Sequence, residues 1–453
     1  MICSPQRIKE ALDLRAPLLS IWKAGVSAVS PAKLVAAEIR ENRDLREQIA
    51  RARRVILLGA GKASREMVEG ALDALPPGKE TRGWIHVIDG LETELGRGIS
   101  LVPVRPKSEN FPTERGLIAS RKMMEMASCA GKEDLGLVLL SGGASAMMPL
   151  PAGGIELGDK QTVTKLLHSC GATITEMNAV RKQLSTIKGG GLAKAWSGDK
   201  TRESIWTLAI SDVVGDDPDV IGSGPTVFNP GTAKDALDCL KRYGLVDQVP
   251  RSVILHLLGK EKDQKEDSKA YPWSKFVLVG DNRKAVRAAM DAAREMGWKT
   301  LDLGSRWEMD TASLADMVVG LVRNVVQNGV GEGPPLCILM GGETHMKLGS
   351  RPGLGGRNQH LALLIAKEMT KPWMAAANWL FGGTDGEDGP TESAGGFADL
   401  AAWHELAAQK VDIGAASASF SSHEALKKGG ALFTTGPTGT NVADLWVGLV
   451  RSC

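Results

Sequence analysis

RRVILLGAGKASREMVEGALDAL, residues 53–75, is the stretch that decides the fold of this chain. Residues 54–58 form a short apolar run typical of a buried strand, and apolar residues in 63–75 lie three and four positions apart, as on one face of a helix. Gly59 and Gly61 open a tight turn between them. A strand, a glycine-rich turn and a helix in this order build parallel sheets, so the segment predicts an α/β fold.

The same pattern recurs along the rest of the chain. We expect further strands in 84–88, 136–140, 204–210, 275–279, 336–340 and 378–381, and helices in 113–128, 159–170, 282–296, 312–327 and 358–369. Single cores stop growing near about 250–300 residues. Because the chain has 453 residues, we predict a Rossmann-like N-terminal domain with a mostly parallel sheet in 1–245 and a second α/β domain in 246–453.

Composition limits the classes of function. Hydrophobic residues make up 43% and charged residues 24%, as in folded proteins, and the formal net charge is only +2. We therefore expect neither a nucleic-acid nor a membrane partner, and we leave a homodimer open. The N-terminus lacks the apolar core of a secretion signal, so we expect a cytoplasmic protein. Free thiols are expected at the scattered cysteines, which are Cys3, Cys129, Cys170, Cys239, Cys337 and Cys453.

The loop after the first strand, Gly59-Ala60-Gly61-Lys62-Ala63-Ser64, is a candidate anion site. It lacks the Walker A spacing and has Ala63 where that loop needs Ser or Thr, and Ser64 replaces the last glycine of a dinucleotide loop. Glycines at a helix N-terminus still expose backbone N–H groups, and Lys62 adds a positive charge beside them. The loop predicts a phosphate or carboxylate site, with a tight turn and a solvated lysine as the alternative.

A second loop, Ser141-Gly142-Gly143-Ala144-Ser145-Ala146, follows the expected strand 136–140. Two glycines flanked by hydroxyls at a strand end allow backbone amides and side-chain donors to surround an oligophosphate such as that of ATP. A turn without a ligand is again the alternative. The ATP-binding residues that we predict from the two loops are Gly59, Gly61, Ser141, Gly142, Gly143 and Ser145.

Charged residues of both signs follow these loops in the first half of the chain. Arg181 and Lys188 precede a glycine triplet and either line an anion pocket, where they would bind substrate, or belong to a charged helix face. Asp212 and Asp216 follow the expected strand 204–210, and carboxylates beside a phosphate loop are what Mg²⁺ needs. Asp212 could equally accept a hydroxyl proton, whereas Asp217, before a proline, is expected to cap a turn.

Glycine-rich strand ends recur in the second half. Glu343 follows the expected strand 336–340, and Arg357 and Asn358 open the helix after it, where an arginine can approach an anion in bidentate fashion. Asp385 follows the strand 378–381, and 435–441 supplies donors and no acids. We predict that Glu343, Asn358 and Asp385 bind a polyhydroxy, anionic substrate.

Taken together, these segments resemble the glycerate 2-kinase family, whose C-terminal part is called the MOFRL domain. The matching strings are GAGKAS (59–64), LLSGGASA (139–146), NAVRKQLSTIKGG (178–190), SDVVGDDPDVIGSGPT (211–226), GGETHMKLG (341–349), GLGGRNQ (353–359), FGGTDGEDGPTESAGG (381–396) and TTGPTGTNVADL (434–445). The resemblance implies an ATP- and Mg²⁺-dependent transfer to the 2-hydroxyl of glycerate, an active site in the cleft between the two domains, and a MOFRL region at about 330–450. It marks Lys62 and Arg357 as essential.

The resulting hypothesis is an in-line phosphoryl transfer in which Lys62, Arg357 and Asp212 are catalytic. Asp212 and Asp216 would hold Mg²⁺, and Asp212 or Asp385 would orient the attacking hydroxyl. The chain departs from the family where a His-Pro-x-Pro-Asp-Glu-like segment is usual and residues 105–110 read RPKSEN, which bears on substrate preference. A nicotinamide-dependent hydroxypyruvate reductase and a non-catalytic nucleotide or sugar-acid binding protein are the other functions we consider.

Overall fold

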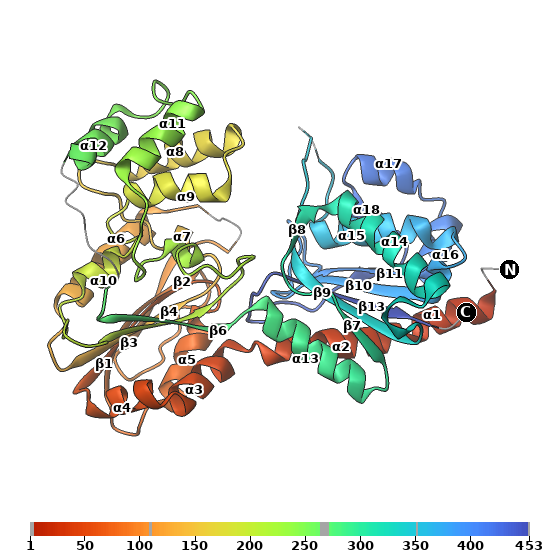
Figure 1. Cartoon of the computed structure of the whole chain (residues 1–453), viewed down its shortest axis with the longest axis horizontal. Helices are drawn as coiled ribbons and strands as arrows, with labels where there is room; N and C mark the ends of the chain where they lie inside the picture. The colour runs from red at the N-terminus through yellow and green to blue at the C-terminus, as the bar shows by residue number, and fades with distance from the viewer. Residues whose placement is uncertain (1–3, 108–110, 263–270, 350–351, 452–453) are drawn as a thin grey trace. The chain divides into compact units, whose positions relative to one another are not determined.

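The computed structural model describes residues 4–107, 111–262, 271–349 and 352–451, and its chain divides into two compact units. One unit is the continuous segment Pro31–Val279, and the other joins Met1–Ser30 to Gly280–Cys453 (Figure 1). Each unit has its own sheet and its own buried core. The two-domain expectation is therefore confirmed.

The sheet of the continuous unit has the strand order β3-β2-β1-β4-β5-β6. Its members are β1 (Arg54–Ala60), β2 (Glu80–Ile88), β3 (Ile99–Arg105), β4 (Asp134–Leu140), β5 (Ile205–Ile210) and β6 (Ser274–Gly280). The pairs β1–β2, β1–β4, β2–β3 and β4–β5 are parallel. This is the order of a doubly wound Rossmann sheet, in which ligands bind beyond the carboxyl ends of the strands where the order reverses, here between β1 and β4.

Helices cover both faces of this sheet. Figure 1 shows α3, α4 and α5 on one face and α6 and α10 on the other, and α8, α9, α11 and α12 form a separate layer with its own buried cluster. A Cβ at Gly70 of α5 would lie only 2.2 Å from the carbonyl oxygen of Ala32 in α3, which shows how closely these two helices pack. The described helices of the unit are α3 (Pro31–Glu41), α4 (Arg43–Arg51), α5 (Ser64–Ala74), α6 (Glu114–Ser128), α7 (Ala144–Met147), α8 (Leu157–Ser169), α9 (Ile174–Gln183), α10 (Gly191–Ala195), η1 (Ile221–Ser223), α11 (Ala233–Arg242) and α12 (Arg251–Lys262).

The sheet of the other unit, which was expected only to be α/β, contains both parallel and antiparallel strand pairs. Its order is β12-β11-β10-β13-β9-β7, with β8 also paired to β9. The strand β13 lies antiparallel between β9 and β10, because it enters the sheet at the end where they finish. The strands are β7 (Lys299–Asp302), β8 (Trp307–Asp310), β9 (Leu336–His345), β10 (Ala377–Gly383), β11 (Gly395–Ala398), β12 (Leu432–Phe433) and β13 (Asp444–Val450).

Helices from both ends of the chain pack on this mixed sheet. Trp22 of α2 is buried with its ring edge-on to Phe433, at 4.9 Å between ring centroids, so the N-terminal helix is part of the core. The described helices are α1 (Pro5–Asp13), α2 (Arg15–Ala28), α13 (Asn282–Glu295), α14 (Thr311–Asn328), η2 (Val330–Glu332), α15 (Arg357–Lys367), η3 (Glu368–Thr370), η4 (Met374–Ala376), α16 (Leu400–Ala408), α17 (Ile413–Ala418) and α18 (Ser422–Lys428).

The boundary expected at 245/246 does not coincide with the boundaries of the compact units. The strand β6 completes the parallel sheet, which keeps the chain up to Val279 with the continuous unit. The first 30 residues belong with the C-terminal segment, because the apolar side of α2 packs on its sheet.

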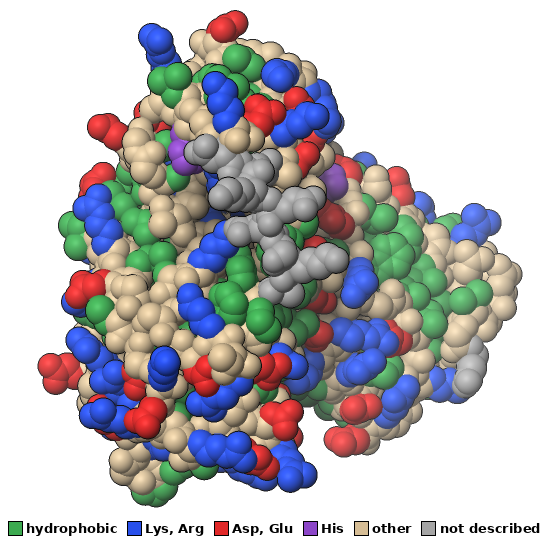
Figure 2. All heavy atoms as spheres, turned by 60° about the vertical axis from the view of Figure 1, so that its left-hand side comes forward, with side chains coloured by type: hydrophobic (Ala, Val, Ile, Leu, Met, Phe, Trp, Pro, Cys, Tyr) green, Lys and Arg blue, Asp and Glu red, His purple; other side chains and the backbone are tan. Residues whose placement is uncertain are grey.

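The distribution of surface charges and the state of the described cysteines agree with the expectations from composition. Figure 2 shows Lys and Arg interspersed with Asp and Glu over the face that it draws. In the parts of the chain that the structure describes, no helix is long and apolar enough to cross a membrane. The cysteines found free are Cys129, Cys170, Cys239 and Cys337, while Cys3 and Cys453 lie outside the described residues.

Candidate active site

The two glycine-rich loops predicted to bind ATP meet where the strand order reverses. The backbone N–H of Lys62 donates to the carbonyl of Gly142 at 2.9 Å, and that of Ala63 donates to the hydroxyl of Ser141 at 3.0 Å. Gly61 has a φ of +135°, and a Cβ there would lie 2.2 Å from the Ser141 oxygen, so only glycine fits this approach. The sheet order therefore joins two loops that lie about 80 residues apart in the chain.

Two cations lie beside the second loop. Gly143 has a φ of +83°, and a Cβ there would lie 3.3 Å from Nη2 of Arg105 and 3.8 Å from Cγ of Lys62. Burial lowers the pKa of Arg105, the last residue of β3. Arg105 was not predicted as a site residue. It is the first residue of the segment 105–110, which differs from the usual family sequence, and residues 108–110 of that segment lie outside the described residues.

Gly59 is buried in the sheet, where it allows close packing of two strands. It lies inside β1, and a Cβ there would approach the carbonyl oxygen of Leu139 in β4 to 2.9 Å. The glycine lets the two central strands come close together, which brings their loops within hydrogen-bonding reach.

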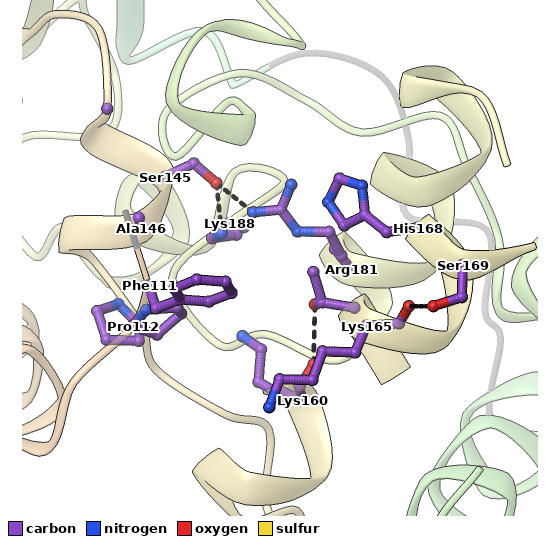
Figure 3. Close-up of a pocket in the computed structure, with 13 residues that line it drawn as sticks. Phe111, Pro112, Ser145, Ala146, Lys160, Lys165, His168, Ser169, Arg181 and Lys188 are labelled. Atoms are coloured by element: carbon purple, nitrogen blue, oxygen red, sulfur yellow. Dashed lines mark hydrogen bonds between the residues drawn. The ribbon is translucent and has the colours of Figure 1, made fainter. Parts of the chain in front are cut away.

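A cavity of about 780 Å³ opens beside the second loop (Figure 3). The hydroxyl of Ser145 stands at its wall and accepts hydrogen bonds from Nη2 of Arg181 at 2.8 Å and from Nζ of Lys188 at 2.7 Å. Lys160, Lys165 and further polar residues line it together with apolar residues such as Phe111 and Pro149, and the lining residues that the structure describes include no Asp or Glu. The predicted residues Gly143, Ser145, Arg181 and Lys188 thus line one cationic cavity, and Lys188 is buried rather than part of a solvated helix face.

The described residues that line this cavity offer its buried cations no negative charge. Burial, together with the charges of Arg181 and its neighbours, lowers the pKa of Lys188 well below its usual range. Burial and the charge of Arg181 lower the pKa of Lys160 to about 7. Lys182, in contrast, forms an ion pair with Asp219 at 2.5 Å. Because burying like charges together is unfavourable, the cavity is suited to bind an anion.

The predicted magnesium ligands follow β5. Asp216 has a φ of +60° and Gly215 a φ of +97°, so the chain turns sharply there. Asp217 caps this turn as expected, since its carboxylate accepts from the N–H of Asp219 at 3.0 Å. In the described part of the chain no group of three or more His, Cys, Asp or Glu residues could hold a metal. One or two carboxylates completed by phosphate oxygens are also a set that Mg²⁺ accepts, so Asp212 and Asp216 stay a prediction.

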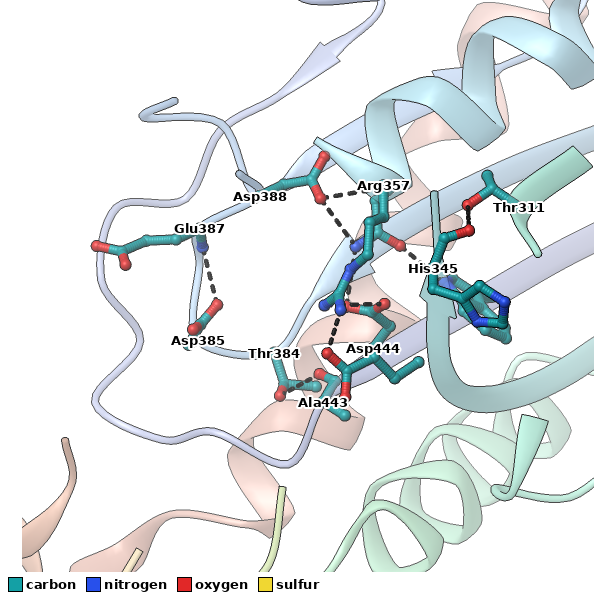
Figure 4. A network of polar contacts seen from close by, with 12 residues as sticks. Thr311, His345, Arg357, Thr384, Asp385, Glu387, Asp388, Ala443 and Asp444 are labelled. Atoms are coloured by element: carbon teal, nitrogen blue, oxygen red, sulfur yellow. Dashed lines mark hydrogen bonds and ion pairs between the residues drawn. The ribbon is translucent and has the colours of Figure 1, made fainter. Parts of the chain in front are cut away.

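A second polar cluster lies in the unit with the mixed sheet (Figure 4). Because β9 and β10 are both antiparallel to β13, their carboxyl ends share an edge with the first residue of β13, Asp444. Arg357, at the start of α15, forms ion pairs with Glu343 and, at 3.7 Å, with Asp444. Burial opposes the charge of Arg357, but these carboxylates outweigh it and raise its pKa.

Asp444 is buried, and one of its oxygens accepts from Nδ2 of Asn358 at 2.9 Å. Burial raises the pKa of Asp444 to about 7, against the opposing effect of Arg357. Asp444 follows the segment 435–441 and was not predicted as a site residue, because only the sheet order places it opposite Arg357.

Asn358 and Asp388 hold the start of α15. The oxygen of Asn358 accepts from the indole N–H of Trp446 at 2.8 Å, and the backbone N–H groups of Asn358 and Gln359 donate to the Asp388 carboxylate at 3.0 and 2.8 Å. Both ends of the buried Asn358 amide are thus used inside the protein. This geometry supports a positioning role for Asn358 next to Arg357.

Asp385 lies in the loop after β10, next to the segment 435–441. Its carboxylate accepts from the N–H of Glu387 at 3.0 Å, and its carbonyl accepts from the N–H of Thr438 at 3.2 Å. The structure thus brings the loop after β10 next to the segment 435–441.

These features define an α/β protein with a cation-lined cavity beside the switch point of a parallel sheet and an arginine among carboxylates in a second α/β unit. Residues 17–258 match the family described as a domain of unknown function, DUF4147, and residues 336–444 match the MOFRL family. The chain is 32% identical to a Pyrococcus horikoshii protein named glycerate 2-kinase, over 98% of both chains. The chain belongs to the glycerate 2-kinase family.

A solved structure supports the same relationship. The crystal structure of a glycerate kinase from Thermotoga maritima matches with a TM-score of 0.83 and 30% identity, covering 97% of this chain and 99% of that one. A relative from Agrobacterium vitis, 35% identical over 86% of both chains, is provisionally named hydroxypyruvate reductase. The fold expected from the resemblance is therefore confirmed.

Proposed function

We propose that this chain is an ATP-dependent kinase that phosphorylates D-glycerate at the 2-hydroxyl, giving 2-phosphoglycerate and ADP. The observation that carries the proposal is the full-length relationship to proteins named glycerate 2-kinase, from Pyrococcus horikoshii and Thermotoga maritima. The cavity at Ser145 supports it, because several cations and no carboxylate are found among its described lining residues, which suits a phosphorylated ligand.

Phosphoryl transfer needs positioning and charge neutralisation more than covalent chemistry. In the proposed arrangement, Ser145, Arg181 and Lys188 bind phosphate oxygens, since all three face one cavity. Lys62, beside Gly143, neutralises charge on the transferring group or on the glycerate carboxylate. Arg357 is the second essential cation, and Glu343 and Asp444 hold its guanidinium in place.

Carboxylates complete the proposed site. Asp212 and Asp216 would hold Mg²⁺, which when bound supplies positive charge to the nucleotide phosphates. Asp212 or Asp385 would accept the hydrogen bond of the attacking hydroxyl and orient it. Asp385 is held for such a task by the loop contacts of its carboxylate and carbonyl.

Phosphorus NMR of the product formed from ATP and D-glycerate tests the proposal. We expect a resonance of 2-phosphoglycerate together with ADP, dependent on Mg²⁺ and abolished by a chelator. A product phosphorylated at the 3-hydroxyl would contradict the position of transfer. No product with D-glycerate, under conditions where MgATP binds, would contradict the kinase activity.

Hydroxypyruvate reduction is the second candidate, favoured by the Rossmann strand order and by the name of the Agrobacterium vitis relative. Asp89, directly after β2, has the place of a ribose-binding acid, but it is paired with Arg115 at 2.9 Å. Ser64 replaces the last loop glycine, and its hydroxyl bonds the carbonyls of Gly61 and His86. Hydroxypyruvate-dependent loss of NADH or NADPH absorbance would favour this candidate over the kinase, and tight binding without turnover would favour a non-catalytic protein.

A further inference from the structure

Lys160 is the one buried cation of the Ser145 cavity for which the structure records no hydrogen-bond acceptor among the described residues. It lies in α8, and only 8% of its surface is exposed. Arg181 and Lys188, by comparison, both donate to Ser145. A buried ammonium without an acceptor is unfavourable unless a ligand supplies one.

The groups that face Lys160 do not supply a counter-charge. Arg181 comes from α9, Lys188 from the segment after it, and Lys165 and His168 from α8 itself (Figure 3). Lys182 of α9 is paired with Asp219. The cavity therefore holds several positive groups in one place, and the described lining residues carry no negative one.

We propose that Lys160 is a specificity-determining residue of this pocket that binds the polyphosphate of the nucleotide and selects for ligands of high negative charge. This inference rests on the proposed function, because it takes MgATP as the ligand of the cavity. Among the described residues the amine has no acceptor, and a phosphate oxygen that enters beside Ser145 provides one. Binding then restores the charged form of the amine.

The protonation state of Lys160 predicts how ligand binding depends on pH. Burial and the charge of Arg181 lower the pKa of Lys160 to about 7, so without a bound anion Lys160 is mostly neutral at pH 8 and mostly charged at pH 6. A bound polyanion favours the ammonium, so binding at pH 8 takes up a proton from solvent, whereas binding at pH 6 needs none at this residue. Affinity should therefore fall as pH rises above about 7. Lys188, whose pKa is also lowered, adds to the total uptake, so the contribution of Lys160 is read from variants.

Calorimetric titration of the full chain with MgATP at pH 8, in two buffers of different ionisation enthalpy, counts the protons taken up. The phosphates carry no titrating proton there, because their second ionisation has a pKa of about 6. We expect Lys160→Met to take up about one proton fewer than the wild type and to bind MgATP roughly tenfold to a hundredfold more weakly. Lys160→Arg, which is always charged, should also take up one proton fewer but should retain most of the affinity.

The unfolding temperature separates a ligand-binding lysine from a structural one, and a variant at an exposed lysine serves as control. Lys160→Met removes a buried amine without an acceptor, so we expect the ligand-free variant to unfold at the same temperature as the wild type or a few degrees higher, and a structural lysine would lower that temperature. Lys241→Met, on the exposed side of α11, is the matched control and should bind as the wild type does.

The outcomes distinguish this inference from the kinase proposal. A chain that binds MgATP with Lys160-dependent proton uptake, yet transfers nothing to D-glycerate, would refute the kinase and support the role of Lys160. A chain that phosphorylates D-glycerate while Lys160→Met takes up as many protons as the wild type would overturn the role of Lys160 and leave the kinase. A wild type that binds no MgATP would overturn both.

Discussion

Lys62 stands where the two glycine-rich loops are joined, and its backbone is held by the carbonyl of Gly142. The side chain thus projects from a rigid base next to Gly143. This combination of a fixed backbone and a positive charge is what charge stabilisation in a transition state requires.

We expect Lys62→Ala to lower kcat with D-glycerate and ATP by roughly 10²–10³-fold, the usual effect of removing one preorganised charge donor. The thermal midpoint should change little, because the main-chain bond to Gly142 is kept. Steady-state kinetics and thermal unfolding measure the two effects, and Lys132→Ala, at an exposed position before β4, is the control. A folded Lys62→Ala protein with turnover near that of the wild type would rule out the assignment.

Asp444 provides a prediction for pH. Its pKa rises from about 4 in the unfolded chain to about 7 in the fold, so between these values the folded state holds a proton that the unfolded state has lost. The stability contributed by this residue is therefore present at pH 4 and is lost as pH rises towards 7, by an amount on the order of a few kcal/mol.

Asp444→Asn should accordingly reduce the fall in thermal midpoint between pH 5 and pH 7, because the amide does not ionise. Thermal unfolding of variant and wild type over this range measures the difference. Asp316→Asn, on the exposed side of α14, should follow the wild type. Parallel pH profiles for Asp444→Asn and the wild type would contradict the raised pKa.

At the scale of elements, the start of α15 determines where Arg357 lies. Gly356 precedes the helix and offers no side-chain cap, and the carboxylate of Asp388, from the loop after β10, accepts the first free N–H groups instead. A Cβ at Gly356 would lie 2.2 Å from the Asp388 carboxyl carbon, so the glycine is needed for this long-range cap.

Asp388→Ala should destabilise the protein by roughly 2–4 kcal/mol, since it leaves two buried N–H groups without acceptors. Turnover should fall as well, because Arg357 is the first residue of the helix. Denaturant unfolding and kinetics test both effects. Asp412→Ala, which removes the exposed cap of α17, should cost only about 1 kcal/mol and leave turnover unchanged. Equal losses for the two variants would contradict the long-range cap.

At the scale of the whole molecule, one unit is built from a single chain segment and the other from two segments. Pro31–Val279 contains a complete sheet and its covering helices in one stretch, whereas the mixed-sheet unit needs the first 30 residues for Leu18, Ile21 and Trp22 of its core. Large apolar side chains of this kind contribute about 1.5–3 kcal/mol each when buried.

We therefore expect residues 31–279 to fold when produced alone, with cooperative thermal unfolding followed by circular dichroism. Residues 280–453 alone should fail to fold, and the same segment joined by a flexible linker to residues 1–30 should recover a cooperative transition. A linked segment with Trp22→Ala should be destabilised by roughly 3–5 kcal/mol, because the buried ring leaves a cavity against Phe433. Cooperative folding of 280–453 alone would contradict this view of the unit.

The sequence by itself determined the α/β class, the seven strands and six helices that carry the clearest periodicity, and the strand-end loops that carry the candidate residues. These properties are local: apolar spacing and glycines at strand ends follow from neighbouring residues. The sequence also indicated the family, because the eight motif strings are specific when they occur together.

Only the tertiary structure decided which of these loops meet. The strand order brings Gly61 against Ser141 and sets Asp444 opposite Arg357, and α8 turns Lys160 into a cavity shared with Arg181. It also made β13 antiparallel and moved the first 30 residues into the second unit. The physical reason is that pairing between strands and burial of side chains depend on contacts between residues far apart in the chain, which the local pattern of apolar and polar residues does not specify.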